Sequence, residues 1–411
     1  MAKRKQTNKD KGGEASRDAA AASPKLKLRD GGRGAKAMRD VVEAHVDRYV
    51  HLRPMLESMI ERTTWSIDRI EWTDGHVEIR GWALAPRDGY CPASFTINGV
   101  EFEHIEYPRN RPDVGRVYWF RPGSELSEFV CRSSRVGREL FVAGIATFHF
   151  CDARTLQPFR EQHGFYCSDP DAEATAFPQD DRRLRVHGNS DASSFRAQGS
   201  SAFVKLERTL NKTLGKGYED FPRVLDWGCG CGRVARYFES RPGCAVVGID
   251  IDQSNVAWCT ENLPFASFSA CQVDPPTGLA DGAFDLIVGI SVMTHLSEAD
   301  RFVWLEELSR VADDGAIALL TVNGAAALCQ TDVGVGSLGL WKQSGMLDVG
   351  VSLSAKDLSA EPDRYIDCFL TEEYIRDRWS HYFDVVDIIP GYIGNVQDLV
   401  VLRKSESKTS S

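Results

Sequence analysis

The alternation of apolar and polar residues divides the chain into an N-terminal β region and a C-terminal α/β region. Between residues 63 and 168, short alternating runs are separated by turn signals such as Asn98-Gly99, a pattern typical of hairpins in a β-sandwich. The expected strands are residues 65–72, 76–84, 93–107, 116–120 and 139–150. Between residues 183 and 404, strand-like and helix-like segments alternate, which predicts an α/β domain.

Four other segments flank or connect these two regions. Residues 37–62 carry apolar side chains at helical spacing and predict one amphipathic helix, packed on the next domain or in a dimer contact. Residues 169–182 are polar with two prolines and predict a linker, and residues 405–411 predict a polar tail. Residues 1–36 contain almost no large apolar side chains, so we expect them to be disordered.

Charge and composition narrow the class of protein. The net charge is −10, but residues 1–40 carry +7 and the remainder −17, which makes a broad nucleic-acid-binding surface unlikely and leaves open whether the basic tail has an acidic partner. No apolar run approaches the roughly 18–20 residues of a membrane span, and the basic N-terminus lacks the apolar core of a secretion signal. Eleven scattered cysteines without zinc spacing predict reduced thiols, no metal site and a cytoplasmic location.

Aromatic residues are concentrated in the β region and permit two interpretations. They can fill the sandwich core, which we expect, or they can form a platform on which sugars stack. The residues concerned are Trp65, Trp72, Trp82, Tyr118, Trp119 and Phe120. The sequences RGWAL, NG and RPDVG resemble small β-sandwich modules that are attached to glycosyltransferases and methyltransferases in bacterial surface-glycan clusters.

A glycine-rich loop follows the first strand of the α/β region, in RVLDWGCGCGRVARYF at residues 223–238. Asp226 ends the strand, and Gly228, Gly230 and Gly232 follow before a predicted helix. Glycines permit tight turns and a close approach of backbone to ligand, and a helix N-terminus offers free N–H groups. The loop therefore predicts a nucleotide-type ligand.

The acidic residues around this loop favour one cofactor class. Asp250 ends the next strand, 24 residues after Asp226, where an acid can accept hydrogen bonds from both ribose hydroxyls. Asp226 would repel the pyrophosphate of a dinucleotide, but it suits a ligand with an ammonium group. The pattern G-x-G-x-G with a preceding acid thus favours S-adenosylmethionine over a nicotinamide dinucleotide. We expect the helix after Asp250 to be capped by Ser254.

On these residues the chain resembles the class I S-adenosylmethionine-dependent methyltransferases, most closely a bacterial subgroup with DWGCGCGR and SV-x-THL motifs. The resemblance covers residues 183–404 and includes VVGIDID, the segment from residue 272 to 296, the segment from 304 to 324 and the closing hairpin at 383–404. It implies a Rossmann-like fold with a mostly parallel seven-stranded sheet and a closing antiparallel strand. The family's Pro-Gly-Gly turn is replaced here by residues 312–315.

The resemblance also implies which residues contact the cofactor. Asp226, Gly228 and Gly230 would hold the methionyl part, Asp250 the ribose, and Ile251 the adenine. The full set is Asp226, Gly228, Cys229, Gly230, Arg233, Asp250, Ile251, Gln272, Val273 and Ser291. Cys229 and Cys231 lack two further ligands, so we expect small buried loop residues rather than a metal pair.

A candidate general base lies just past the fourth strand of the α/β region. His295 in SVMTHLSEAD can accept a proton from a hydroxyl acceptor. It can also contact substrate or cofactor, or merely brace the next helix, where Ser297 and Asp300 form a capping pattern. His187 is the second candidate base.

Two further segments are expected around the ligands. Residues 185–199 resemble a lid over the cofactor, with Arg185, His187 and Phe195 as candidates, although an ordinary loop is the alternative. Residues 324–370 are long for a connection and predict an insertion that shapes the acceptor pocket, with Tyr365 and Asp367 as candidates.

The sequence therefore predicts a methyltransferase that acts on a small molecule or a glycan hydroxyl. Two alternatives stay open: a catalytically silent methyltransferase-like scaffold with a glycan-binding sandwich, and a nicotinamide-dependent oxidoreductase. The sequence indicates no particular oligomeric state.

Overall fold

The computed structural model describes residues 48–60, 64–73, 75–86, 92–134, 141–142, 144–159, 163–169, 175–331, 335–351 and 366–406. The expected disordered segment 1–36, the first part of the amphipathic helix, Tyr365 and most of the polar tail lie outside these residues.

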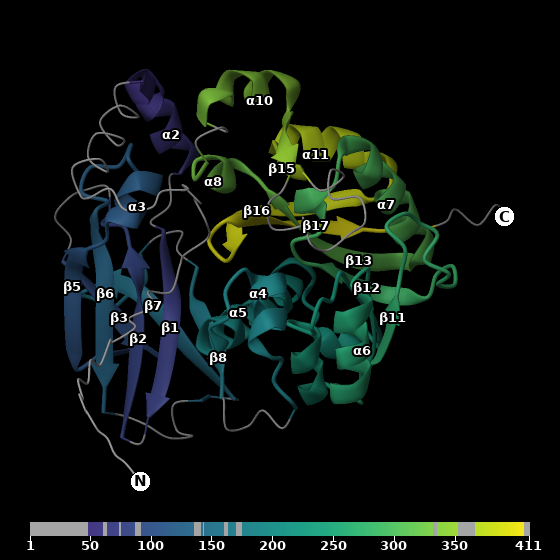
Figure 1. Cartoon of the computed structure of the whole chain (residues 1–411), viewed down its shortest axis with the longest axis horizontal. Coiled ribbons are helices and arrows are strands. Elements are labelled where there is room, and N and C mark those ends of the chain that lie inside the picture. The colour runs from purple at the N-terminus through teal and green to yellow at the C-terminus, as the bar shows by residue number, and fades with distance from the viewer. Residues whose placement is uncertain are drawn as a thin grey trace, which may run out of the picture.

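Two antiparallel four-stranded sheets form the N-terminal part of the molecule, beside the C-terminal part (Figure 1). The first sheet has the order β1-β2-β6-β5, with bounds Trp65–Thr73, His76–Ala83, Leu126–Ser133 and His104–Asn110. The second has the order β4-β3-β7-β8, with bounds Val100–Glu101, Ala93–Ile97, Ile145–Asp152 and Phe165–Ser168. Side chains of both sheets share one hydrophobic core, in which the Phe95 and Phe129 rings lie 4.2 Å apart. This confirms the predicted sandwich.

The six aromatic residues singled out in this region all lie within the described residues, and they lie wholly or partly in hydrophobic cores. Trp65 is almost fully buried, and its ring lies among those of four phenylalanines of the sandwich core. Trp82, Tyr118 and Phe120 are buried in a second cluster, while Trp72 and Trp119 are half-buried. The expected core role is confirmed for the buried members.

The prediction of a strand at residues 116–120 is wrong. Helix α3 (Pro112–Val117) occupies its start, and a turn follows. Pro112 stands at the first helical turn, where its fixed φ and missing N–H favour helix initiation. Strands β6 and β8 were not predicted as such, because small polar and cysteine residues at inward positions, such as Ser127 and Cys131, weaken the apolar alternation.

A mixed sheet organises the C-terminal part. This nine-stranded sheet has the order β11-β10-β9-β12-β13, and β13 then pairs both with β17 of the antiparallel hairpin β17-β16 and with β15 (Ile366–Leu370) of the insertion; β17 runs antiparallel to β13 and β16. The bounds are Ser267–Ala270, Ala245–Asp250, Arg223–Trp227, Phe284–Gly289, Ala312–Asn323, Gln397–Arg403 and Asp384–Ile393. Hydrophobic clusters cover both faces of the sheet. These seven strands confirm the predicted Rossmann-like fold with its closing hairpin.

The insertion after β13 contains short helices and a ribbon. Helices α8 (Ala325–Leu328) and α10 (Leu338–Ser344) precede the antiparallel pair β14 (Met346–Val351) and β15 (Ile366–Leu370). The ribbon joins the sheet where Phe369 pairs with Asn323 at the carboxyl end of β13. The insertion thus stands at the sheet edge where ligands bind in such folds.

One apolar cluster joins the sandwich to this insertion. Trp82 and Phe120 from the sandwich side pack with Leu328, Trp341 and Phe369 from the insertion. The hydroxyl of Tyr118 accepts a hydrogen bond of 3.0 Å from Gln330. The described part of the N-terminal helical segment, with η1 (Val50–Leu52) and α2 (Arg53–Met59), packs on the same cluster through Leu56. Its predicted packing on the next domain is confirmed for these residues.

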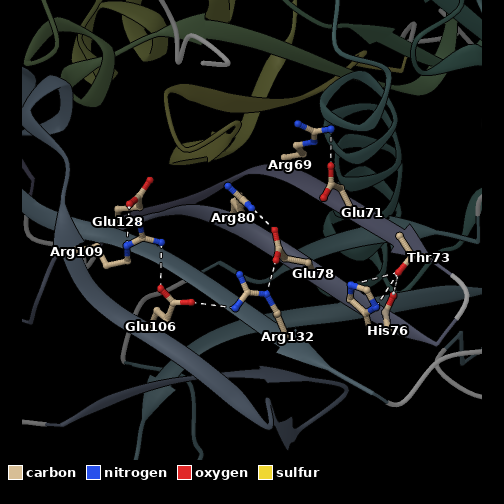
Figure 2. A network of polar contacts seen from close by, with 10 residues as sticks. All are labelled: Arg69, Glu71, Thr73, His76, Glu78, Arg80, Glu106, Arg109, Glu128 and Arg132. Atoms are coloured by element: carbon tan, nitrogen blue, oxygen red, sulfur yellow. Dashed lines mark hydrogen bonds and ion pairs between the residues drawn. The ribbon is translucent and has the colours of Figure 1, made fainter. Parts of the chain in front are cut away.

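The outer face of the sheet β1-β2-β6-β5 carries a network of paired charges (Figure 2). Arg80 and Arg132 both bind Glu78, and Arg132 also lies 2.9 Å from Glu106. Although burial opposes it, these two guanidiniums hold the pKa of Glu78 below its ordinary value. Because its arginines are matched by glutamates, this face is a self-paired, solvated surface.

Candidate functional site

The glycine loop begins where β9 ends and turns back against β10. The N–H groups of Gly228 and Cys229 both donate to the carbonyl of Ile249, at 2.8 and 3.1 Å. Gly228 and Gly230 have φ values of 73° and 53°, in the left-handed region that favours glycine. A Cβ on Gly230 would lie 2.8 Å from a methyl of Val186, so the segment that carries Val186 could not pack over the loop.

Asp250 holds the same loop from the end of β10. Its carboxylate accepts hydrogen bonds from Gly230 N–H at 2.7 Å and from Asp252 N–H at 2.8 Å. Burial raises the pKa of Asp250, while these backbone donors oppose the rise. The predicted partners Gly230 and Asp250 are therefore brought together, and the acid stands at the carboxyl edge of the sheet.

Asp226 lies beneath the loop with one oxygen unsatisfied. Its side chain is 3 % exposed, and Oδ2 is buried without a hydrogen-bond partner among the described residues. Burial, followed by the negative charge of Asp250, raises the pKa of Asp226 to about 7. Arg233 opposes this rise, and burial lowers the pKa of Arg233 itself. A buried acceptor without a donor is a place where a ligand cation or N–H group would bind favourably.

The helix after β10 corrects one prediction. Helix α6 (Gln253–Asn262) is capped by Asp252, whose carboxylate accepts from Ser254 N–H and Asn255 N–H, so Ser254 is not the cap. The helix expected after the glycine loop is a short 3-10 segment, η4 (Ala235–Ser240). Arg185 reaches Asp252 with an ion pair of 2.6 Å.

The predicted lid is formed in part by helix α4 (Asp180–His187), which begins inside the expected linker. Val186 packs over Gly230, and His187 lies 3.5 Å from Arg233 Nη1 and 2.9 Å from Ser194 Oγ. Phe195 does not reach the site surface: it is fully buried on α5 (Ala192–Leu214), in a cluster with Cys231.

The remaining predicted cofactor residues differ in exposure. Ile251 and Val273 are half-buried, and Gln272 is exposed. The carbonyl of Val273 accepts a hydrogen bond of 3.2 Å from the Trp304 indole. Cys229 is buried, as expected for a small loop residue, and every cysteine in the described ranges has a free thiol. No group of three or more metal-ligating side chains occurs among the described residues.

Ser291 follows β12 on the other side of the loop. It has a φ of 64°, and its N–H donates to the Thr321 hydroxyl at 2.7 Å. Its hydroxyl and the Gln397 side chain are in hydrogen-bond contact at 2.9–3.1 Å. The adjacent Val292 lies against Gly228, where a Cβ would come within 2.3 Å of a valine methyl. Gln397 gave no local signal in the sequence, because β17 brings it here from the far end of the chain.

His295 stands at the end of η5 (Met293–His295) and faces the insertion ribbon. Its Nδ1 lies 3.2 Å from Oδ1 of Asp367 on β15, and both side chains are part-exposed. The following helix α7 (Glu298–Val311) is capped by Ser297, which accepts from Asp300 N–H. His295 therefore does not cap this helix, and its polar contact is with an acid of the acceptor-side insertion.

Comparisons with known proteins address this part of the chain. Residues 224–315 match the family described as a methyltransferase domain. The match supports a methyltransferase-type domain over this segment. The matched segment runs from β9 to the start of β13 and so contains the glycine loop and His295.

Relatives among characterised proteins are similar over limited segments. The chloroplastic tocopherol O-methyltransferase of Arabidopsis thaliana is 27% identical over 191 residues, which cover 44% of this chain and 48% of that protein. The O-antigen chain terminator bifunctional methyltransferase/kinase WbdD of Escherichia coli is 33% identical over 111 residues, 25% of this chain and 15% of that protein. The chain thus spans about half or less of the length of these relatives. The solved structure of the PH0226 protein from Pyrococcus horikoshii OT3 is similar with 17% identity and a TM-score of 0.37, over 52% of this chain and 93% of that one.

Proposed function

We propose that the chain is an S-adenosylmethionine-dependent methyltransferase that acts on a hydroxyl group of a small molecule or glycan. The observation that carries the proposal is the buried acid pair Asp226 and Asp250 at the glycine loop. Asp226 would repel the pyrophosphate of a dinucleotide but complements an ammonium group, and Asp250 complements the hydroxyls of a ribose.

The residues present fit this cofactor. Asp226 would hold the ammonium through the oxygen that has no partner, and Asp250 would accept the ribose hydroxyls beside Gly230. When bound, S-adenosylmethionine supplies an electrophilic methyl group on a sulfonium. Arg185 and Val186 of the lid would exclude water from above the loop.

The pair His295 and Asp367 supports a hydroxyl acceptor. A hydroxyl is a weak nucleophile until its proton is removed, so a general base accelerates its reaction. Asp367 Oδ1 lies 3.2 Å from Nδ1, although Nδ1 has no hydrogen-bond partner among the described residues, so the carboxylate would orient the ring by its charge while Nε2 would accept the proton. We assign His295 as the base and Asp367 as its positioning residue.

The cofactor is tested by thermal unfolding of the full chain with S-adenosylmethionine, S-adenosylhomocysteine or NAD. A ligand that binds the native state raises the unfolding temperature by mass action. We expect both adenosyl ligands to stabilise the wild type, and this effect to be lost in Asp250→Ala but kept in Glu239→Ala, which changes an exposed acid of η4. Stabilisation by NAD alone would contradict the proposal.

The base is tested by transfer of labelled methyl from S-adenosylmethionine to a panel of hydroxyl-bearing glycans and metabolites. On any acceptor that is methylated, His295→Ala should lower kcat by about 10²–10⁴-fold while the cofactor Kd changes by less than about twofold. Asp367→Asn should lower kcat less. An unchanged kcat in His295→Ala would remove its assignment as the base.

A further inference from the structure

A hollow lined by both polar and apolar groups lies on the sandwich, away from the glycine loop. It has a volume of about 600 Å³, within the usual range for small-molecule sites. Strands β3 and β7, the loop after β7 and helix α5 supply its lining. The polar side chains used below are Thr96, Thr147, His149, Gln157 and Arg208.

The strand pattern explains why these side chains gather there. Phe95 and Phe148 point into the sandwich core, so the alternating neighbours Thr96, Thr147 and His149 point to the opposite face of the sheet. Thr96 and His149 are directly paired across β3 and β7. Helix α5 packs on β8 and so covers part of this outer face of the sheet β4-β3-β7-β8. The hollow lies on the part of the face that α5 leaves open.

Arg208 brings a positive charge to the edge of the hollow. It is exposed on α5, and its guanidinium lies 5.2 Å from the centroid of the Tyr166 ring. Within the described part of the chain it forms no ion pair, and none of the lining residues is an aspartate or glutamate. This differs from the opposite sheet, where the arginines of the charge network are paired with glutamates (Figure 2). The lining therefore carries one positive charge and no acid, and the nearby Glu101, which pairs with Thr96 across β3 and β4, is hydrogen-bonded to Ser94.

The other lining groups suit hydroxyls. Burial and the charge of Arg208 lower the pKa of His149, which favours the neutral imidazole with its one donor and one acceptor. The hydroxyls of Thr96 and Thr147 and the amide of Gln157 can each both donate and accept. Such a mixture matches a ligand with several hydroxyl groups better than an apolar one.

We propose that this hollow binds an anionic, hydroxyl-rich small molecule, a sugar phosphate or a sugar acid, with Arg208 holding the anionic group. The hydroxyls of the ligand would bind Thr147, His149 and Gln157. The site does not depend on the proposed methyl transfer, because it shares no residue with the glycine loop.

Calorimetric titration of the full chain tests this site with glucose 6-phosphate, glucuronate, glucose and inorganic phosphate. We expect at least one of the two anionic sugars to bind, and to bind about tenfold or more tightly than glucose and inorganic phosphate. The preferred sugar then distinguishes a phosphate from a carboxylate. Asp250→Ala should leave this binding unchanged, which separates it from the cofactor site.

Two matched variants locate the binding. Arg208→Gln should weaken it about tenfold, as expected for loss of a charge-assisted hydrogen bond. Lys212→Gln removes a positive charge from the next turn of α5, outside the lining, and should change the affinity by less than about twofold. Absence of binding by both anionic sugars at millimolar concentration, equal binding of inorganic phosphate, or equal affinity of Arg208→Gln and wild type would each overturn the proposal.

Discussion

Replacement of Asp226 by asparagine should destabilise the chain at acid pH and stabilise it at alkaline pH. Burial and Asp250 raise the pKa of Asp226 to about 7, against an ordinary value of 3.8. The folded chain therefore holds this proton more tightly than the unfolded chain. The stability that the protonated acid contributes is complete below pH 3.8 and is lost as the pH rises to about 7.

The size of the effect follows from these two values. Full ionisation of the buried acid costs on the order of 4 kcal/mol, since each pKa unit corresponds to about 1.4 kcal/mol. The asparagine side chain would have the same shape without the charge, but its amide N–H group would stand where Oδ2 of Asp226 has no partner, at a cost of about 1–3 kcal/mol. Between pH 5 and pH 8, the stability of Asp226→Asn relative to wild type should rise by about 3 kcal/mol.

Urea unfolding of wild type and Asp226→Asn at pH 5, 6, 7 and 8 measures this difference. Glu239→Gln, a change of an exposed acid on η4, serves as the control and should stay within about 0.5 kcal/mol of wild type at every pH. A difference between Asp226→Asn and wild type that is constant across this range would refute the reasoning, because it would mean that Asp226 is already ionised in the folded chain at pH 5.

Two further substitutions test the packing around the site. Gly230→Ala should destabilise the chain by about 1–3 kcal/mol and weaken cofactor binding, because φ at Gly230 is positive and Val186 blocks the new methyl. Gly243→Ala is the control: its new methyl would meet open space, so it should be nearly neutral, and thermal unfolding and cofactor titration compare the two variants. Phe120→Ala should lower the free energy of unfolding in urea by about 3–5 kcal/mol and speed amide hydrogen exchange at Phe369, because both residues belong to the cluster that joins sandwich and insertion. Val100→Ala, at an exposed position, should change neither the stability nor the exchange. Unchanged exchange at Phe369 in Phe120→Ala would argue against coupling between the sandwich and the insertion.

The glycine loop could be predicted from sequence because its determinants are local. Asp226, the three glycines and Asp250 lie within 25 residues, and their spacing alone defines a strand, a turn and a second strand. The sequence predicts Ser254 as the cap of α6, two residues after the actual cap Asp252, because both residue types are good caps. The backbone N–H groups of Ser254 and Asn255 decide between them.

Contacts between distant segments could not be predicted in the same way. His295 and Asp367 are 72 positions apart, and only the pairing of β15 at the end of β13 brings them together. The prediction of a strand at 116–120 is wrong for a local reason, since Pro112 starts a helix there. The aromatic residues of this segment are buried because the insertion packs on them. Packing between segments far apart in the chain determines both the His295–Asp367 contact and the burial of these aromatic residues, and a single sequence carries little information about such packing.

We propose that Asp226 and Asp250 make the glycine loop a site for a cationic adenosyl cofactor. Calorimetric titration with S-adenosylmethionine at pH 6 and pH 8, in buffers of different ionisation enthalpy, tests it directly. We expect binding of one ligand per chain, with release of close to one proton at pH 6 and progressively less as the pH rises through about 7, because the bound ammonium ionises Asp226. Binding of NAD in place of S-adenosylmethionine, or proton uptake at pH 6, would contradict it.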